Sequence, residues 1–208
     1  MMKFSRNEVN DLLISWIVLS VAFALFRLPH IPQNSLFGGI FTLIKNPAYV
    51  NQVPISILKM LVIVGTAVVL HELSHKYVAQ SYGLWAEYRK FDRGLIFALL
   101  LSLTGFFFFA LPGAVMIRST AWITQEIEAK TSIAGPAANI TVGIVALLIR
   151  GAGFFPVFLV DLAYINVLLA IFNLLPVPPL DGSKIIRYNI LMWLIPFILA
   201  VVMLISIF

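Results

Sequence analysis

The sequence contains no cysteine among its 208 residues. Disulfide bonds and thiolate metal ligands are therefore excluded, and any metal site must be built from histidine and carboxylate side chains. Charged residues are also scarce, at 11% of the chain, whereas 61% of the residues are hydrophobic. A soluble domain of this size could not cover such a sequence with polar surface, so the composition predicts a multi-span membrane protein.

Five apolar runs are long enough to cross about 30 Å of hydrocarbon as helices. They cover residues 11–28, 57–82, 131–149, 154–175 and 189–208, and the first is interpreted as a retained span rather than a signal peptide. No linker, repeat or soluble segment separates them, so we expect a single transmembrane domain over residues 1–208.

A sixth apolar run, 94–117, differs from the others. It is interrupted by Gly105, Pro112 and Gly113, and its second half is rich in aromatic and β-branched residues, which favour extended structure. Non-helical backbone at membrane depth must be buried in protein or line a wet cavity. The expected fold class is therefore an all-α membrane protein of about five to six transmembrane helices, with a re-entrant β-hairpin-like segment near the active site.

Positive charge predicts the orientation. If the N-terminus is cytoplasmic and 94–117 re-enters without crossing, ten of the 14 Lys and Arg residues lie on the cytoplasmic side, which agrees with the positive-inside rule. A tight hairpin crossing twice would give the same count, so that alternative stays open. The net charge of +5 then reports orientation and contact with anionic lipid, not nucleic-acid binding.

The run 57–82 contains the pattern His-Glu-x-x-His at residues 71–75. Successive helical residues turn by about 100°, so His71 and His75 lie about 40° apart on one helix face. Both imidazoles can then bind one Zn²⁺, while Glu72 beside them can act as general base on a zinc-activated water. Such a bare pattern also arises by chance, and a catalytic zinc requires a further protein ligand.

The third ligand is predicted from depth in the membrane. Apart from Glu72, only Asp161 and Asp181 are acids embedded in apolar sequence, and His30 lies in a Pro-bounded outer segment. His71 lies about 21 Å along a helix that descends from the outer side, which places the motif in the cytoplasmic half of the membrane. Asp161 is close to the outer end of its run, whereas Asp181 follows a proline-rich break at the cytoplasmic end. Asp181 is therefore the predicted ligand.

Four segments of the sequence resemble the site-2 protease family of intramembrane zinc metallopeptidases, peptidase family M50. Residues 71–75 resemble its His-Glu-x-x-His helix, 134–139 its A-G-P-x-x-N motif, and 173–182 its N-x-x-P-x-x-x-L-D-G motif. Residues 110–115 resemble a re-entrant hairpin whose edge pairs with extended substrate. The similarity covers roughly residues 57–187, and Ser183 stands where the family usually has a second glycine.

The resemblance implies hydrolysis of peptide bonds in or next to the transmembrane segments of membrane-protein substrates. His71, His75 and Asp181 would hold one Zn²⁺ per chain, with Glu72 as general base. Substrate contacts would come from Asn173, Asn139, Pro112 and Gly113. For Asn139, a hydrogen bond between helices is an equally open alternative.

The expected location is the cell membrane, with the N-terminus and the active-site opening on the cytoplasmic side. The expected partners are a transmembrane protein substrate and the lipid bilayer, without nucleic acid. The PDZ and CBS domains of many relatives are not found in the 208 residues, so substrate identity and oligomeric state are not predicted. The alternative function is a non-proteolytic zinc-binding membrane protein, either a metal transporter or a pseudo-protease.

Overall fold

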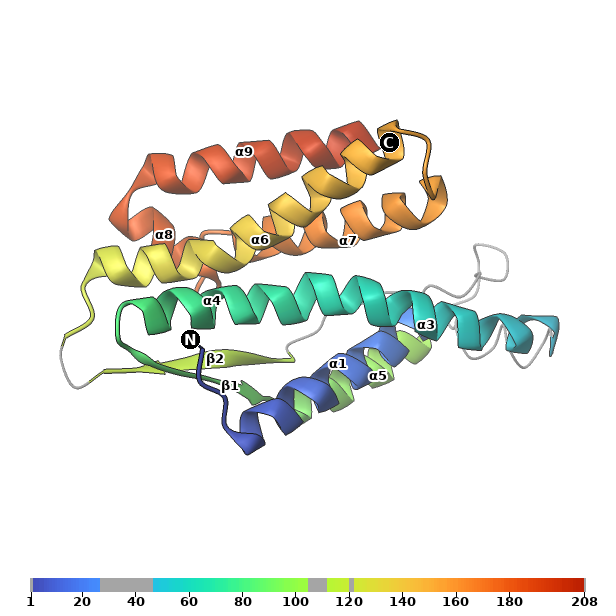
Figure 1. The fold of residues 1–208 in the computed structure, drawn as a ribbon, viewed down its shortest axis with the longest axis horizontal. Helices are drawn as coiled ribbons and strands as arrows, with labels where there is room; N and C mark the ends of the chain where they lie inside the picture. Colours follow the sequence, from blue (N-terminus) through green and yellow to red (C-terminus); the bar gives the residue numbers. More distant parts are fainter. Residues whose placement is uncertain (1, 27–46, 105–111, 120–121, 208) are drawn as a thin grey trace. The chain divides into compact units, whose positions relative to one another are not determined.

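The computed structural model describes residues 2–26, 47–104, 112–119 and 122–207. These residues are mostly helical, with one small two-stranded antiparallel sheet (Figure 1). The chain divides into two compact units. Unit 1 comprises residues 1–3, 66–87 and 115–208, and unit 2 comprises residues 4–65 and 88–114. His30, in the Pro-bounded outer segment, lies outside the described residues.

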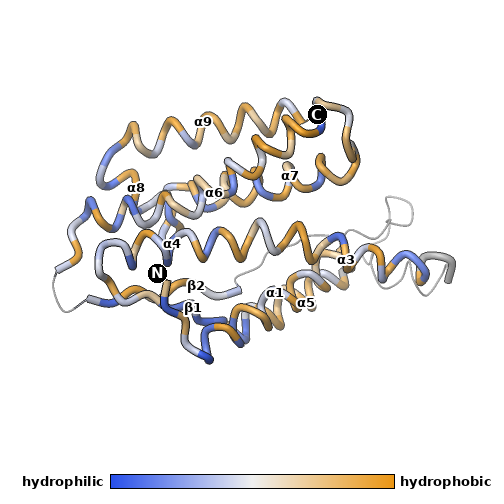
Figure 2. Tube along the Cα trace, viewed as in Figure 1, coloured by the Kyte–Doolittle hydropathy of each residue, from blue (hydrophilic) through white to orange (hydrophobic). Residues whose placement is uncertain are grey.

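In the described part of the chain, each of the five predicted apolar runs is mostly helical. Four helices in the described part of the chain are long and apolar enough to cross a membrane: Arg6–Phe26, Val50–Ser81, Gln125–Gly151 and Ile190–Ile207. The remaining run forms α7 (Pro156–Asn173), an apolar helix near the lower limit of spanning length. Figure 2 shows hydrophobic residues along nearly the whole length of α9 (Ile190–Ile207), as expected for a helix exposed to lipid.

Helix α6 (Gln125–Gly151) is the central element of unit 1. It packs against α4 (Leu70–Ser81), α7, α8 (Asp181–Tyr188) and α9. Its first turn is capped by Thr124, whose hydroxyl accepts a hydrogen bond from the Ile127 N–H at 3.3 Å. A Cβ built at Gly143 would lie 2.7 Å from Val167 Cγ2, so this glycine allows α6 and α7 to approach closely.

The chain between α7 and α8 is rich in proline. Pro176, Pro178 and Pro179 lack backbone donors and end the helix, as the sequence predicts. Asp181 is the first residue of α8, and a Cβ at Gly182 would lie 2.6 Å from the Leu175 carbonyl oxygen. The glycine therefore lets the new helix begin directly against the end of α7, and this tight turn holds the Asp181 carboxylate in place.

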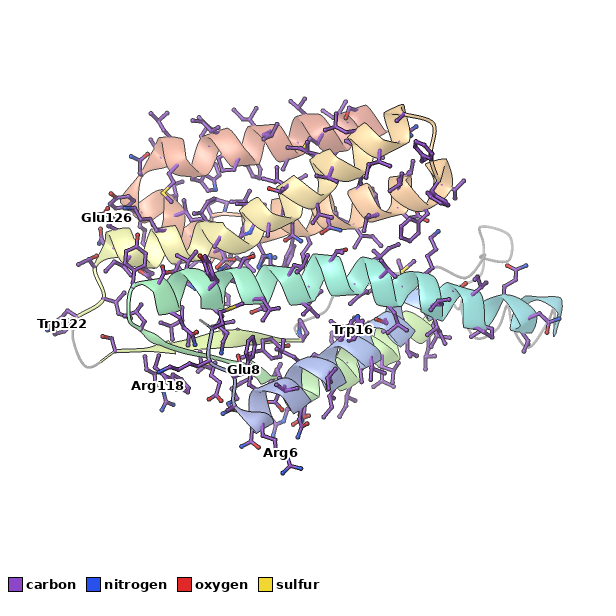
Figure 3. All side chains as sticks on the ribbon, viewed as in Figure 1. Arg6, Glu8, Trp16, Arg118, Trp122 and Glu126 are labelled. Atoms are coloured by element: carbon purple, nitrogen blue, oxygen red, sulfur yellow. The ribbon has the colours of Figure 1, made fainter. Side chains whose placement is uncertain are left out.

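Unit 2 is built around α1 (Arg6–Phe26), which packs against α3 (Val53–Val64) and α5 (Asp92–Thr104); a short 3₁₀ helix, η1 (Pro47–Gln52), precedes α3. The indole N–H of Trp16 donates to the Leu61 carbonyl at 2.7 Å, and Trp16 points from α1 toward α3 in Figure 3. Glu8 is fully buried and accepts a hydrogen bond from the Tyr88 N–H at 2.9 Å. Both contacts satisfy backbone groups with side chains from α1.

The sheet pairs β1 (Trp85–Lys90) with β2 (Gly113–Arg118). The Phe91 N–H donates to the Pro112 carbonyl at 2.9 Å, which sets the register. Because alternate residues of an antiparallel strand point their N–H groups to opposite edges, Val115 and Ile117 face away from β1. On β1 the same alternation turns the Tyr88 N–H away from β2, where it bonds to Glu8.

The apolar run 94–117 contains both a helix and a strand. Its first part belongs to helix α5, and its second part is extended in β2, as its residue types favour. The partner of β2 comes from residues 85–90, before the run, so the two-stranded element is not contained within 94–117. Residues 105–111 lie outside the described part.

Candidate metal centre

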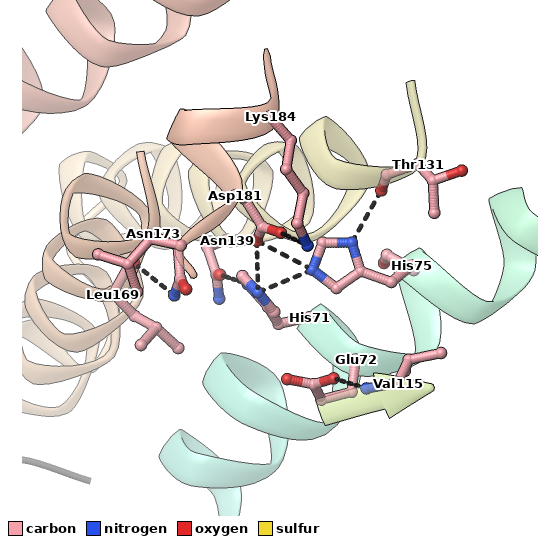
Figure 4. A network of polar contacts seen from close by, with 12 residues as sticks. His71, Glu72, His75, Val115, Thr131, Asn139, Leu169, Asn173, Asp181 and Lys184 are labelled. Atoms are coloured by element: carbon pink, nitrogen blue, oxygen red, sulfur yellow. Dashed lines mark hydrogen bonds and ion pairs between the residues drawn. The ribbon is translucent and has the colours of Figure 1, made fainter. Parts of the chain in front are cut away.

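Two histidines one turn apart on α4 face a carboxylate from α8. The Nε2 atoms of His71 and His75 are 3.0 Å apart. Asp181 Oδ2 lies 3.5 Å from His71 Nε2 and 3.1 Å from His75 Nε2 (Figure 4). Within the described ranges this is the one group of three His and acidic side chains placed to share a metal ion, and all three residues belong to unit 1 and are largely buried.

Hydrogen bonds on the far side of each ring direct the lone pairs. His75 Nδ1 lies 2.8 Å from the Thr131 carbonyl oxygen. A carbonyl only accepts, so Nδ1 carries the proton and Nε2 presents its lone pair. His71 Nδ1 lies 2.6 Å from Asn139 Oδ1, with the same consequence for His71. Two nitrogen lone pairs and a carboxylate oxygen therefore converge on one small volume.

This donor set fits zinc. Three lone pairs at such short separations repel each other unless a cation lies among them. Ligand atoms bound to tetrahedral zinc at 2.0–2.1 Å would lie roughly 3.3–3.4 Å from one another, and the three separations observed are 3.0, 3.1 and 3.5 Å. Two imidazoles and one carboxylate also match the ligand type of catalytic zinc sites, which keep a fourth position open.

Gly135 on α6 forms one wall of the centre. A Cβ at this position would lie 2.6 Å from His71 Nε2 and closer still to His75 Nε2. Any side chain would therefore occupy the space in front of the two nitrogens. This contact explains the glycine of the A-G-P-x-x-N motif, because α6 can pass this close to the histidines only with glycine at position 135.

The two carboxylate oxygens of Asp181 face different groups. Its Oδ2 faces the imidazoles, and its Oδ1 lies 3.9 Å from Lys184 Nζ, one turn along α8. A carboxylate binds a metal in its ionised form, so Asp181 would be deprotonated in a metal-loaded centre.

Glu72 is buried beside the three candidate ligand residues but is not one of them. Its Oε2 accepts a hydrogen bond from the Val115 backbone N–H at 3.1 Å, a contact within unit 1 (Figure 4). The carboxylate is thus held by the edge of β2 that faces away from β1. No residue pattern in the sequence indicates this backbone donor.

The other predicted site residues occupy three different settings. Asn139 is buried against His71, whereas Asn173 Nδ2 donates to the Leu169 carbonyl of its own helix at 3.0 Å. Pro112 and Gly113 belong to unit 2, where Gly113 has φ +147° and a Cβ on it would lie 2.6 Å from the Tyr88 hydroxyl. Asp161, the weaker metal candidate, lies in α7 outside the ligand group.

Residues 151–195 match the sequence model of peptidase family M50. Over 197 residues the chain is 34% identical to a protein of Methanocaldococcus jannaschii that is provisionally named a zinc metalloprotease; the alignment covers 93% of this chain and 90% of that relative. The chain belongs to peptidase family M50, the site-2 protease family.

Two further relatives of this M50 chain are longer proteins. A second M. jannaschii protein, named a zinc metalloprotease, is 34% identical over 134 residues, which cover 62% of this chain and 33% of that protein. A protein of Mycolicibacterium smegmatis, provisionally named the zinc metalloprotease Rip2, is 29% identical over 144 residues, or 59% of this chain and 54% of that protein. No solved structure matches the chain. The M50 chain is thus a membrane protein of a metalloprotease family.

Proposed function

We propose that this protein is an intramembrane zinc metalloprotease that hydrolyses peptide bonds in or next to transmembrane segments of membrane proteins. The observation that carries the proposal is the position of the metal centre. His71 and His75 both lie within the candidate span Val50–Ser81, and Asp181 meets them from α8. Ionisable groups at membrane depth are costly and are retained for function.

His71 Nε2, His75 Nε2 and Asp181 Oδ2 would hold one zinc ion per chain. When bound, zinc would polarise a scissile carbonyl and make water acidic enough to lose a proton near neutral pH. The glycine at position 135 keeps side-chain atoms away from the two nitrogens that would bind the metal. The distances among the three donor atoms support this assignment.

Glu72 would move the proton. Its carboxylate takes a proton from the attacking water, whose oxygen adds to the carbonyl carbon of the scissile peptide. The same carboxyl then gives the proton to the departing nitrogen as the C–N bond breaks, so one residue acts as base and then as acid. Burial beside the ligand residues and the hydrogen bond from Val115 keep the Glu72 side chain in one orientation.

The substrate would bind in extended form along β2. A transmembrane helix satisfies its carbonyls internally, so its peptide bonds must unwind before they can be cleaved. The edge of β2 that faces away from β1 could replace some of the lost hydrogen bonds by strand addition, for example at Ile117, while the Val115 N–H stays bonded to Glu72. Asn173 is the favoured side-chain contact, and 94–117 would re-enter the membrane.

The proposed orientation follows from charge. With the N-terminus in the cytoplasm, ten of the 14 Lys and Arg residues lie on the cytoplasmic side. Lys184 and Arg187 follow Asp181 directly in α8. The active site would therefore open toward the cytoplasm of a cell-membrane protein, which gives water a short route to the centre.

The test is cleavage of a single-span model substrate by the purified protein in liposomes, with Glu72→Gln beside the wild type. Glutamine keeps an acceptor for the Val115 N–H but cannot take a proton, so cleavage should slow by about 10²–10⁴-fold at unchanged zinc content. Glu126→Gln is the matched control, because Glu126 is half-exposed and pairs with Lys130. Equal cleavage by Glu72→Gln and wild type would overturn the mechanism. A wild type that holds zinc but cleaves nothing would favour a non-proteolytic zinc-binding protein.

A further inference from the structure

Two asparagines in apolar helices extend a hydrogen-bond chain from His71 into the helix bundle of unit 1. Asn139 on α6 and Asn166 on α7 are both fully buried. Asn139 Nδ2 donates to Asn166 Oδ1 at 3.0 Å and to the Ala67 carbonyl at 2.8 Å. Burying two carboxamides in this setting is costly unless each polar atom is paired.

The orientation of both carboxamides follows from two backbone carbonyls, which can only accept hydrogen bonds. Asn166 Nδ2 lies 2.9 Å from the Leu162 carbonyl, so this end of Asn166 must be the NH₂ group and its oxygen must face Asn139. The Ala67 carbonyl fixes the NH₂ group of Asn139 in the same way. The remaining Nδ2 hydrogen of Asn166 points to Thr66 Oγ1 at 3.3 Å.

The orientation of the Asn139 carboxamide determines which ring nitrogen of His71 carries the proton. With its NH₂ group committed, Asn139 presents only Oδ1 to the ring, 2.6 Å from His71 Nδ1. His71 must therefore carry its proton on Nδ1, which leaves the Nε2 lone pair for the metal. The reverse orientation of Asn139 would place an NH₂ group against Nδ1 and favour the wrong tautomer.

The helix preceding the histidines is adapted to this contact. Ala67 lies in η2 (Gly65–Val69), a π-helical turn between α3 and α4. A π turn departs from regular α-helical pairing and often occurs at functional sites. Thr66, from the same turn, supplies the last partner of the chain.

We propose that Asn139 is a positioning residue that fixes the tautomer and ring orientation of His71, and that Asn166 holds the Asn139 carboxamide in the direction this requires. The inference rests on the zinc site proposed above and gives Asn139 a role other than substrate contact. Outer-shell partners of metal-binding histidines contribute about 10–100-fold to metal affinity or activity.

The experiment measures zinc affinity of the purified full-length protein by competition with a chelator, together with kcat and KM on the model substrate. Asn139→Leu should lower zinc affinity by roughly 10–100-fold. Asn139→Asp keeps an acceptor for His71 Nδ1 but loses the donors to Ala67 and Asn166, so it should retain more zinc than Asn139→Leu. Asn166→Leu removes only the second support and should fall between them. Asn173→Leu is the matched control, with unchanged zinc affinity.

Wild-type zinc affinity in Asn139→Leu would overturn the inference. A raised KM in that variant would then assign Asn139 to the substrate, and a lowered unfolding temperature alone would assign it to helix packing. If Asn139→Leu does not fold, the zinc affinities of Asn166→Leu and Asn166→Asp are compared instead. Aspartate at position 166 keeps the acceptor for Asn139 Nδ2, so Asn166→Asp should bind zinc more tightly than Asn166→Leu. Absence of zinc from the wild type would instead overturn the proposed metal site itself.

Discussion

Glu72 Oε2 and the Val115 backbone N–H are joined by a hydrogen bond of 3.1 Å. The proposed base is therefore held by the strand edge to which an extended substrate would add. Because Val115 faces away from β1, its N–H does not take part in the sheet and remains available to Glu72. Removing this N–H should disturb the base without breaking the β1–β2 pairing.

Val115→Pro tests this relationship. Proline has no N–H but is tolerated on an edge strand where that group does not pair. A hydrogen bond to a charged group contributes about 1.5–3 kcal/mol, so cleavage should fall roughly tenfold to a hundredfold, measured as kcat with zinc content unchanged. Met116→Pro is the control: its missing N–H faces β1, so it should lower the unfolding temperature. A normal kcat in Val115→Pro would show that the hydrogen bond does not position Glu72.

Asp181→Ala tests the third ligand. Asp181 Oδ2 lies within 3.5 Å of both imidazole nitrogens, and its loss leaves only two protein ligands. Zinc affinity should fall by more than about a hundredfold, beyond the effect of an outer-shell partner. Metal analysis after dialysis measures this, and Asp161→Asn should retain zinc because Asp161 lies outside the ligand group. Full zinc occupancy in Asp181→Ala would refute the assignment.

Several features could be predicted because they depend on local or one-dimensional regularities. The spacing of His71 and His75 places them on one face of any helix, and the described residues of the five apolar runs are mostly helical. Asp181 could be chosen over Asp161 because depth along a span follows from rise per residue. In the structure Asp181 Oδ2 lies within 3.5 Å of both imidazole nitrogens, and its role as a metal ligand stays a prediction.

The supporting contacts could not be predicted, since they join segments far apart in sequence through groups without a residue signature. The Val115 N–H and the Thr131 carbonyl are backbone groups, present at almost every position. Asn166 is visible in the sequence only as an isolated polar residue in an apolar run, and its link to Asn139 depends on how α6 and α7 pack. The pairing of residues 85–90 with β2 could not be predicted either, because this segment is short and lies in a polar flank.

Gly135→Ala tests whether the space in front of the histidines is needed for the metal. The added methyl group would lie 2.6 Å from His71 Nε2, and α6 cannot easily retreat because it also packs against α7, α8 and α9. We expect zinc binding to be lost, since even one methyl group in a close-packed site forces strain of about 1–3 kcal/mol and here it would press against the two nitrogens that are proposed to bind the metal.

Gly143→Ala provides the comparison on the same helix. Its Cβ would meet Val167 Cγ2 at 2.7 Å and the end of the flexible Met203 side chain, Cε, at 2.9 Å. This variant should lose stability in a thermal unfolding measurement yet bind zinc with normal affinity. Equal zinc affinity in both glycine variants would mean that α6 can move away from the histidines, and that the small residue at 135 serves helix packing rather than the metal centre.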